Sequence, residues 1–233
     1  MRTTAIQIFS SLALGTILLG PATTIAQQAP QAAKYSGGEL GLRLGYGLPF
    51  GESSQGTNLD NGLNGQIPLI LDAGYRFNPN VFAGLMFGFG FGQIKDPNNN
   101  CSRPNVSCSA SVIRLGLNAL YRFMPEQRFA PFVGVGAGYE WYSAKGTGNI
   151  GGFTGSTSTT VRGFEFLNLQ GGADYRLSGN SVIGPFASFS LGRFDSYSTQ
   201  VTTGATTTST NGDINNTAMH EWLLIGVRGA FSL

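Results

Sequence analysis

The sequence predicts an all-β protein, an eight-stranded antiparallel up-and-down transmembrane β-barrel, and three observations predict it. Eight segments alternate apolar with polar or small residues, as strands with two different faces do. Short turns and long polar loops alternate between these segments. A tripeptide, Tyr-Arg-Phe or Tyr-Arg-Leu, ends three of the segments at residues 75–77, 121–123 and 175–177. The expected strands are 39–50, 66–77, 81–92, 109–123, 129–142, 161–177, 181–194 and 219–233.

The first residues read as an export signal. Met1-Arg2 is followed by a mostly apolar run, 8–19, and by a small-residue exit around Ala22 to Ala26. The run is shorter than the ~20 residues of a transmembrane helix, so we expect a signal peptide cleaved after Ala26. The expected division of the chain is a signal peptide at 1–26, a periplasmic N-terminal segment at 27–37 and an outer-membrane β-barrel at 38–233.

The alternation gives each strand one bulky apolar face and one charged or small face. In the first strand the apolar face carries four leucines, Tyr46 and Phe50. The other face carries Glu39, Arg43 and three glycines. The second, fourth and eighth strands repeat this, with Asp72 and Arg76, Arg114 and Arg122, and Arg228 on the polar face. The third and fifth strands, 81–92 and 129–142, place four and three glycines on the polar face.

The connections alternate in length. Residues 78–80, 124–128 and 178–180 are short turns with Pro, Asn or Gly. Residues 51–65, 93–108, 143–160 and 195–218 are long and polar. Short periplasmic turns and long external loops are typical of outer-membrane barrels, and an even number of strands leaves both termini in the periplasm.

A soluble lipocalin-like barrel has the same strand count, but it buries the bulky apolar face. Here glycines alternate with charges on the other face, and a narrow eight-stranded interior has room only for a filling of side chains. We therefore expect the charged face inside and the apolar face in lipid. Two charges, Glu165 and Arg193, fall on the apolar face. Each lies 12 residues above its turn, since 177 − 165 = 12 and 193 − 181 = 12, and we expect them to pair above the membrane.

The repeated tripeptide predicts an aromatic girdle. Tyr and the residue two positions later share the lipid face, while the Arg between them points inward. Aromatic residues favour membrane interfaces because their rings are apolar while an edge or hydroxyl can meet water. The expected girdle residues are Tyr75, Phe77, Tyr121, Phe123 and Tyr175, with Trp141 nearer the outer interface.

The charged residues that face inward are the strongest candidates for a functional site. Seven basic residues, which include Arg162, face four acidic ones, which include Glu39, and buried charges need partners. We expect Asp72, Asn118 and Asp174 to partner the Arg residues of the three tripeptides. A salt-bridged, structural plug and an ion path or gate are the two interpretations, and the narrow interior favours the plug. The expected network is Arg43, Asp72, Arg76, Arg114, Asn118, Arg122, Glu140, Asp174, Arg176 and Arg228.

Few residues point to catalysis, a cofactor or a metal. Cys101 and Cys108 form a close pair that we expect to be a disulfide in an exported chain. The single histidine, His220, is far from both cysteines, and Glu221 beside it faces the opposite way in a strand. We therefore expect no metal site, no cofactor and no enzyme. The net charge of +1 after removal of Arg2 gives no reason to expect a nucleic-acid partner.

With this pattern, and with a last strand ending Val227, Gly229, Phe231, Leu233, the chain resembles the small outer-membrane barrels of the OmpA and OmpX type over residues 38–233. The resemblance implies a non-enzymatic, monomeric protein of the outer membrane of a diderm bacterium, surrounded by lipid and lipopolysaccharide. It also implies insertion by the barrel-assembly machinery, although the family usually ends in an aromatic residue and this chain ends in Leu233. The four long loops suggest a structural or adhesion-type role with a host-surface or phage ligand. The alternatives are a small-solute, porin-like pore and a lipid A-modifying enzyme that uses histidine.

Overall fold

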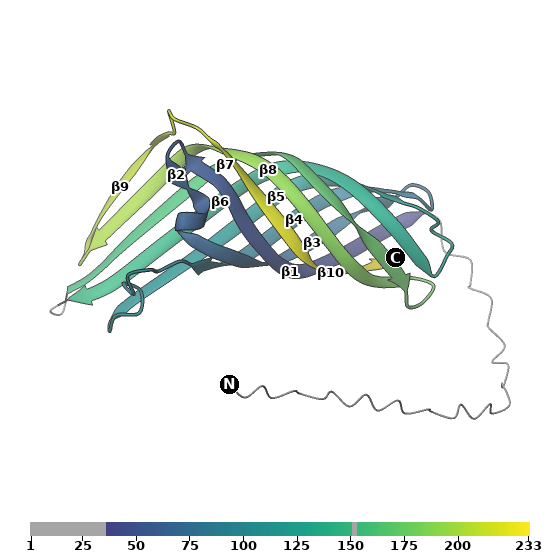
Figure 1. The fold of residues 1–233 in the computed structure, drawn as a ribbon, viewed down its shortest axis with the longest axis horizontal. Coiled ribbons are helices and arrows are strands. Elements are labelled where there is room, and N and C mark those ends of the chain that lie inside the picture. Colours follow the sequence, from purple (N-terminus) through teal and green to yellow (C-terminus); the bar gives the residue numbers. More distant parts are fainter. Residues whose placement is uncertain (1–35, 151–152) are drawn as a thin grey trace, which may run out of the picture. The chain divides into compact units, whose positions relative to one another are not determined.

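Eight antiparallel strands close into a ring in the computed structural model of this protein, which describes residues 36–150 and 153–233 (Figure 1). β10 completes the ring because it pairs with both β8 and β1. The predicted fold class is thereby confirmed. The expected signal peptide at 1–26, and all but the last two residues of the 27–37 segment, lie outside the described residues. The ring strands are β1 (Gly37–Ser54), β3 (Leu63–Arg76), β4 (Val81–Ile94), β5 (Val106–Arg122), β6 (Phe129–Ile150), β7 (Phe153–Arg176), β8 (Ser181–Thr203) and β10 (Met219–Ser232).

The apolar face of each ring strand points outward. Leucines at alternating positions are exposed, as Leu117 is to 65% of its surface, while the residues between them are buried. So many exposed leucines would favour aggregation in water, whereas the outer wall of a membrane barrel is apolar because it contacts lipid. Among the described residues, no helix has the length and apolar character needed to cross a bilayer.

The three short turns and both ends of the ring lie at one end of the barrel, which we call the turn end. The Leu233 backbone N–H donates to the carbonyl of Gly38 at 2.8 Å, so β10 finishes where β1 starts. The other end, where the long connections lie, is called the loop end. β3 and β4 can approach closely near the turn end because Gly74 and Gly84 have no Cβ atom, which would collide with the facing strand.

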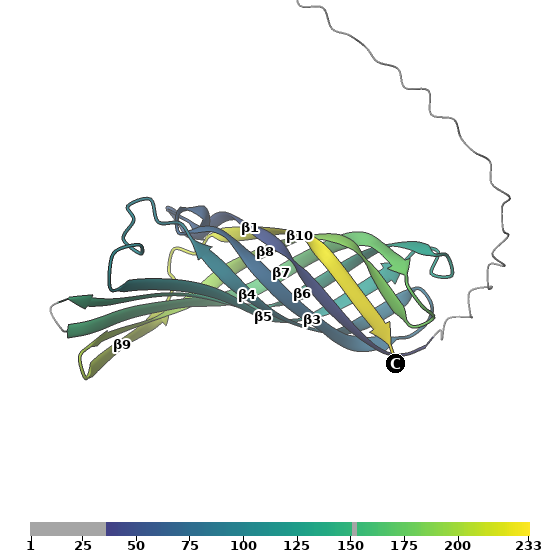
Figure 2. The same cartoon turned by 90° about the horizontal axis from the view of Figure 1, so that it is seen from below.

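Two connections that we expected to be loops, 143–160 and 195–218, consist largely of strand, and that prediction is wrong. β6 and β7 remain paired as far as Ile150 and Phe153, and β8 pairs with β9 (Thr206–Asp213). These hairpins project beyond the ring at the loop end (Figure 2). Their residues are mostly Thr, Ser and Gly, so they form strands without the apolar alternation that a membrane requires.

The two other connections are less regular. In the first, β2 (Thr57–Asn58) pairs with the end of β1 and is followed by the 3₁₀ turn η1 (Leu59–Asn61). In the second, between β4 and β5, Cys101 forms a disulfide with Cys108 at the start of β5, which confirms that prediction.

A β-bulge corrects the predicted faces of β7. Opposite β8 the register shifts between Glu165 and Leu167, so one extra residue reverses every side chain above that point. Glu165 is consequently buried, and Arg193 stands opposite Phe164 instead of Glu165. Arg162, which we expected inside, is exposed and donates from Nε to the Ser196 hydroxyl at 2.9 Å.

Candidate functional site

The barrel interior near the turn end holds a network of charged and amide side chains, which we call the turn-end network. It consists of Glu39, Arg43, Asp72, Arg76, Asn118, Arg122, Gln170, Asp174 and Arg228. These residues come from β1, β3, β5, β7 and β10, and all but Arg76 are buried. They share the barrel interior because each lies on the face opposite the apolar positions of its strand.

Glu39 is the acceptor that joins most arginines. Its carboxylate bonds to Arg76, accepts from Nη2 of Arg122 at 2.5 Å, and lies 3.8 Å from Nη2 of Arg228. Asp174 joins two of the same cations, accepting from Nε of Arg122 at 3.1 Å and from Nη1 of Arg228 at 2.8 Å. The two carboxylates therefore connect strands on all sides of the ring.

Asp72 organises the next layer. It accepts from Nη2 of Arg43 at 2.8 Å and from Nδ2 of Asn118 at 2.7 Å. Arg43 also donates from Nη1 to Gln170 at 3.0 Å. Two phenylalanines fill the space beside the cations, since Arg43 lies 5.8 Å from the ring centre of Phe186 and Arg228 lies 4.6 Å from that of Phe132.

The expected pairing within each strand is wrong. Asp72 bonds to Arg43 and not to Arg76, and Asn118 bonds to Asp72 and not to Arg122. Arg176 stays outside the network and donates to the backbone carbonyls of Pro125 and Glu126 in the 124–128 turn. The strands of a closed barrel are tilted, so a long guanidinium side chain reaches neighbours across the ring more readily than residues of its own strand.

A second group of polar residues lies nearer the loop end, and we call it the loop-end cluster. Its members are Arg114, Glu140, Glu165, Asn168, His220 and Trp222, and each is enclosed by the ring. Arg114 donates from Nε to Glu140 at 2.5 Å and lies 3.4 Å from Glu165. The other oxygen of Glu140 accepts from Nε1 of Trp222 at 3.1 Å and lies 3.3 Å from Nε2 of His220.

The loop-end cluster contains functional groups that the sequence did not indicate. Glu221, the neighbour of His220 in sequence, faces the opposite way, whereas the barrel brings Glu140 to His220 from β6. Glu165, which we expected on the outer face, lies inside because of the bulge. The available signal was the adjacent apolar pair Phe166 and Leu167, where the apolar face changes from odd to even positions.

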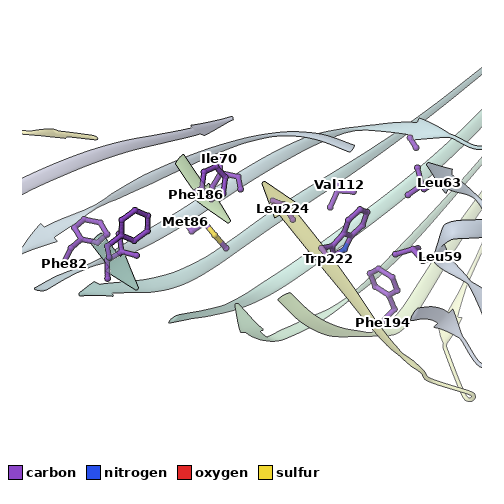
Figure 3. Packing of buried hydrophobic residues seen from close by; sticks show 13 residues of the cluster. Leu59, Leu63, Ile70, Phe82, Met86, Val112, Phe186, Phe194, Trp222 and Leu224 are labelled. Carbon is purple, nitrogen blue, oxygen red and sulfur yellow. The ribbon is translucent and has the colours of Figure 1, made fainter. Parts of the chain in front are cut away.

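An apolar layer covers the loop-end cluster, and we call it the cap. Leu59 of η1, Leu63 and Phe194 are buried at the loop end, with Trp222 and Val112 beneath them (Figure 3). The Phe194 ring stacks on His220 at a centroid distance of 4.0 Å. Only 2% of the His220 surface is exposed, so the ring wall and the cap enclose its imidazole.

The aromatic residues of the expected girdle lie on the outer surface. Tyr75 packs edge to face on Phe77, and Tyr121 packs in the same way on Phe123, at centroid distances of 5.3 and 5.1 Å. Tyr175 lies beneath the guanidinium of Arg128 at the same end of the barrel. Trp141 packs on Tyr139 farther up the wall. Within residues 36–150 and 153–233, no group of three His, Cys, Asp or Glu residues is arranged to hold a metal ion.

Comparison with known proteins finds outer-membrane barrels. The sequence model of the family described as outer membrane protein beta-barrel domain matches residues 17–184. No curated protein sequence matches the chain. A major outer membrane protein from Thermus thermophilus is similar in structure, with a TM-score of 0.56 and 14% identity over 85% of this chain and 99% of that one.

Two further solved structures align less well. Ail, the attachment invasion locus protein of Yersinia pestis, gives a TM-score of 0.41 with 15% identity over 84% of this chain and 99% of that one. The outer membrane protease OmpT from Escherichia coli gives 0.38 with 9% identity, over 86% and 97% of the two chains. At these identities the likenesses concern the fold alone.

Proposed function

We propose that this chain, which belongs to the outer membrane protein β-barrel family, is a non-enzymatic surface-interaction protein. Its location is the outer membrane of a Gram-negative bacterium, and lipid and lipopolysaccharide surround its apolar wall. The turn end faces the periplasm and the loop end faces outward, because outer-membrane barrels have short periplasmic turns and long external connections. The barrel-assembly machinery inserts it, and it works as a monomer.

The projecting hairpins carry the proposal. The upper parts of β5, β6, β7 and β8 continue past the ring as one sheet that ends in β9. Of the described strands only β8 pairs with β9, so the other edge of this eight-residue strand is open. Asp213 is its single charged residue, and it contains no proline.

An open edge of this kind is a binding surface for an extended polypeptide. Proteins normally protect long edge strands with Lys, Pro or a bulge, since an unprotected edge pairs with other chains. Strand addition of this type gains its affinity from backbone hydrogen bonds and needs no apolar anchor. A Thr- and Ser-rich edge therefore suits an exposed segment of a host surface protein or of a phage receptor-binding protein.

The interior supports a structural role in preference to transport or catalysis. The turn-end network, the loop-end cluster and the cap occupy successive levels of the barrel with buried side chains. An ion crossing the barrel must displace ion-paired arginines that are costly to separate from their partners. The one histidine is buried between Phe194 and Glu140, where no external substrate can reach its imidazole.

Removal of the β8–β9 hairpin tests the proposal. Residues 198–211 are replaced with Asn-Gly, which joins the paired residues Tyr197 and Gly212 through a two-residue turn. Cells with the shortened protein should lose adsorption of phage or adhesion to immobilised host matrix protein, relative to cells with the full chain. A second variant carries Lys at Thr208 and Thr210, which keeps the hairpin but protects its edge, so it should lose binding as well. Equal binding by all three strains contradicts a role for β9, provided that heat-modifiable gel migration shows an intact barrel in each.

A further inference from the structure

We propose that the loop-end cluster binds one monovalent cation of the sodium or potassium type. The cation is held by the Glu165 carboxylate and the side-chain carbonyl of Asn168. This site is independent of the surface role proposed above, because it lies inside the barrel beneath the cap.

The charges of the cluster do not balance. Two carboxylates, Glu140 and Glu165, face one guanidinium, Arg114, which leaves an excess of 2 − 1 = 1 negative charge when the imidazole of His220 is counted as uncharged. Among the described residues, Arg114 and His220 are the ion-pair partners of these two carboxylates. No more than 4% of the surface of any of the four residues is exposed. An uncompensated charge so far from water is strongly unfavourable.

The cluster contains two oxygen atoms that accept no hydrogen bond, and two nitrogen atoms, Nη2 of Arg114 and Nδ1 of His220, that also lack a hydrogen-bond partner. Nδ2 of Asn168 donates to Oε1 of Glu165 at 2.8 Å. Oε2 of Glu165, 3.4 Å from Nε of Arg114, and Oδ1 of Asn168 have no hydrogen-bond partner, although both residues are 3% exposed. The hydrogen bond between the two side chains keeps the groups that carry these oxygens in contact. A carboxylate oxygen and an amide carbonyl oxygen are ligands that hard cations favour.

The charge count of the loop-end cluster alone, apart from the one positive charge in excess in the turn-end network, indicates the valence of the ligand. A water molecule would satisfy both oxygens but would leave the negative charge uncompensated. A divalent cation would reverse the excess to one positive charge. A monovalent cation satisfies the oxygens and neutralises the cluster, and the apolar cap formed by Leu59, Leu63 and Phe194 then holds it away from water.

Refolding in different salts tests the site. The cap covers the cluster, so the cation must be present while the barrel forms. The full chain without its signal peptide is refolded from urea into detergent micelles in sodium, potassium or choline chloride at equal ionic strength and pH. At about a hundred times its dissociation constant, the cation should raise the midpoint of thermal unfolding by roughly 5–10 °C over choline.

The variant Glu165→Gln should abolish the difference between the salts. It removes the negative charge, and its amide can donate to Oδ1 of Asn168. Glu52→Gln, which removes a carboxylate outside the cluster, should keep the difference. If Glu165→Gln does not refold, the salt comparison on the unsubstituted chain still decides.

Three results overturn the proposal. The first is an equal midpoint in all three salts, and the second is a salt difference that persists in Glu165→Gln. The third is a midpoint that changes with pH but not with the cation, because a proton would then neutralise the cluster. Refolding in magnesium chloride as a fourth salt tests the assigned valence, and greater stabilisation by magnesium than by sodium or potassium contradicts it.

Discussion

Replacement of Glu39 by Gln should strongly destabilise the barrel. The turn-end network holds four arginines and three carboxylates, an excess of 4 − 3 = 1 positive charge. Glu39→Gln raises this excess to 4 − 2 = 2 and leaves Arg122 and Arg228 to share Asp174. Removal of one partner from a buried ion pair costs about 3–5 kcal/mol, because the other charge stays buried. We expect a loss of this size.

The opposite substitution in the same ion pair should cost less. Arg76→Gln reduces the excess to zero, and Glu39 keeps its contacts with Arg122 and Arg228. The Arg76 side chain is also the most exposed in the network, at 11%. Its loss should cost no more than about 1–3 kcal/mol, the range for a buried hydrogen-bond partner left unpaired.

Urea unfolding of the refolded protein in micelles measures both values through the fluorescence of Trp141 and Trp222. Glu52→Gln serves as the control on the same strand, since it lies outside the ring interior. The reasoning is refuted if Glu39→Gln lies within about 1 kcal/mol of the unsubstituted protein, which is the scale of a single net hydrogen bond. It is also refuted if Arg76→Gln is the more damaging change.

Three other outcomes follow from the same description. In planar lipid bilayers the protein should show no steady conductance, since buried side chains occupy the interior; stable openings of nanosiemens size would support a pore instead. Leu117→Arg, on the lipid-facing wall, should cost about 2–4 kcal/mol in refolding into vesicles, whereas Thr208→Arg on the projecting hairpin should leave stability unchanged. Reduction of the Cys101–Cys108 disulfide should make residues 95–105 more sensitive to protease. Heat-modifiable migration should stay unchanged, because the bond closes a loop outside the ring. Migration at the position of the unfolded protein would contradict this.

The ring was predictable because lipid imposes a rule on every residue of a spanning strand. Leu117 and Arg114 sit on opposite faces as their positions require, since a charge on the lipid face is costly. The same rule does not apply to the hairpins above the membrane, because their residues do not contact lipid. In β9 both faces meet water, so Thr and Ser can occupy every position and the apolar alternation disappears. Alternation of apolar and polar residues therefore does not indicate the strands within 143–160 and 195–213.

The partners within the interior were less predictable than its members. Sequence position indicates which face a residue occupies, but a guanidinium can reach several carboxylates across a narrow ring. Asp174 illustrates this, because it bonds to Arg122 and Arg228, which are 52 and 54 residues away along the chain. Such pairings depend on strand tilt and on the room left by Phe132 and Phe186, which no local pattern encodes.

The bulge in β7 lies at a height where a change of register is tolerated. A shift by one residue exchanges the two faces of a strand, which within the lipid would place charges against acyl chains. Arg162, which the bulge turns outward, lies 14 residues above Arg176, a height of roughly 35 Å in a strand with a typical tilt. The apolar band of such barrels is only about 25 Å tall, so Arg162 emerges above it and bonds to Ser196.

The same reversal turns Glu165 into the interior, where it becomes the second carboxylate beside Arg114. With the same sequence and no bulge, the loop-end cluster would hold one carboxylate and one guanidinium, and its charges would balance. The bulge in β7 is therefore the origin of the buried negative charge in this sequence. Deletion of Phe166 should remove the bulge but keep Glu165 inside, because Leu167 alone then fills the outward position between Glu165 and Asn168. The difference between sodium and choline should therefore survive in the refolding assay. Loss of the difference on deletion would show that the site depends on the local geometry of the bulge and not on the charge of Glu165 alone.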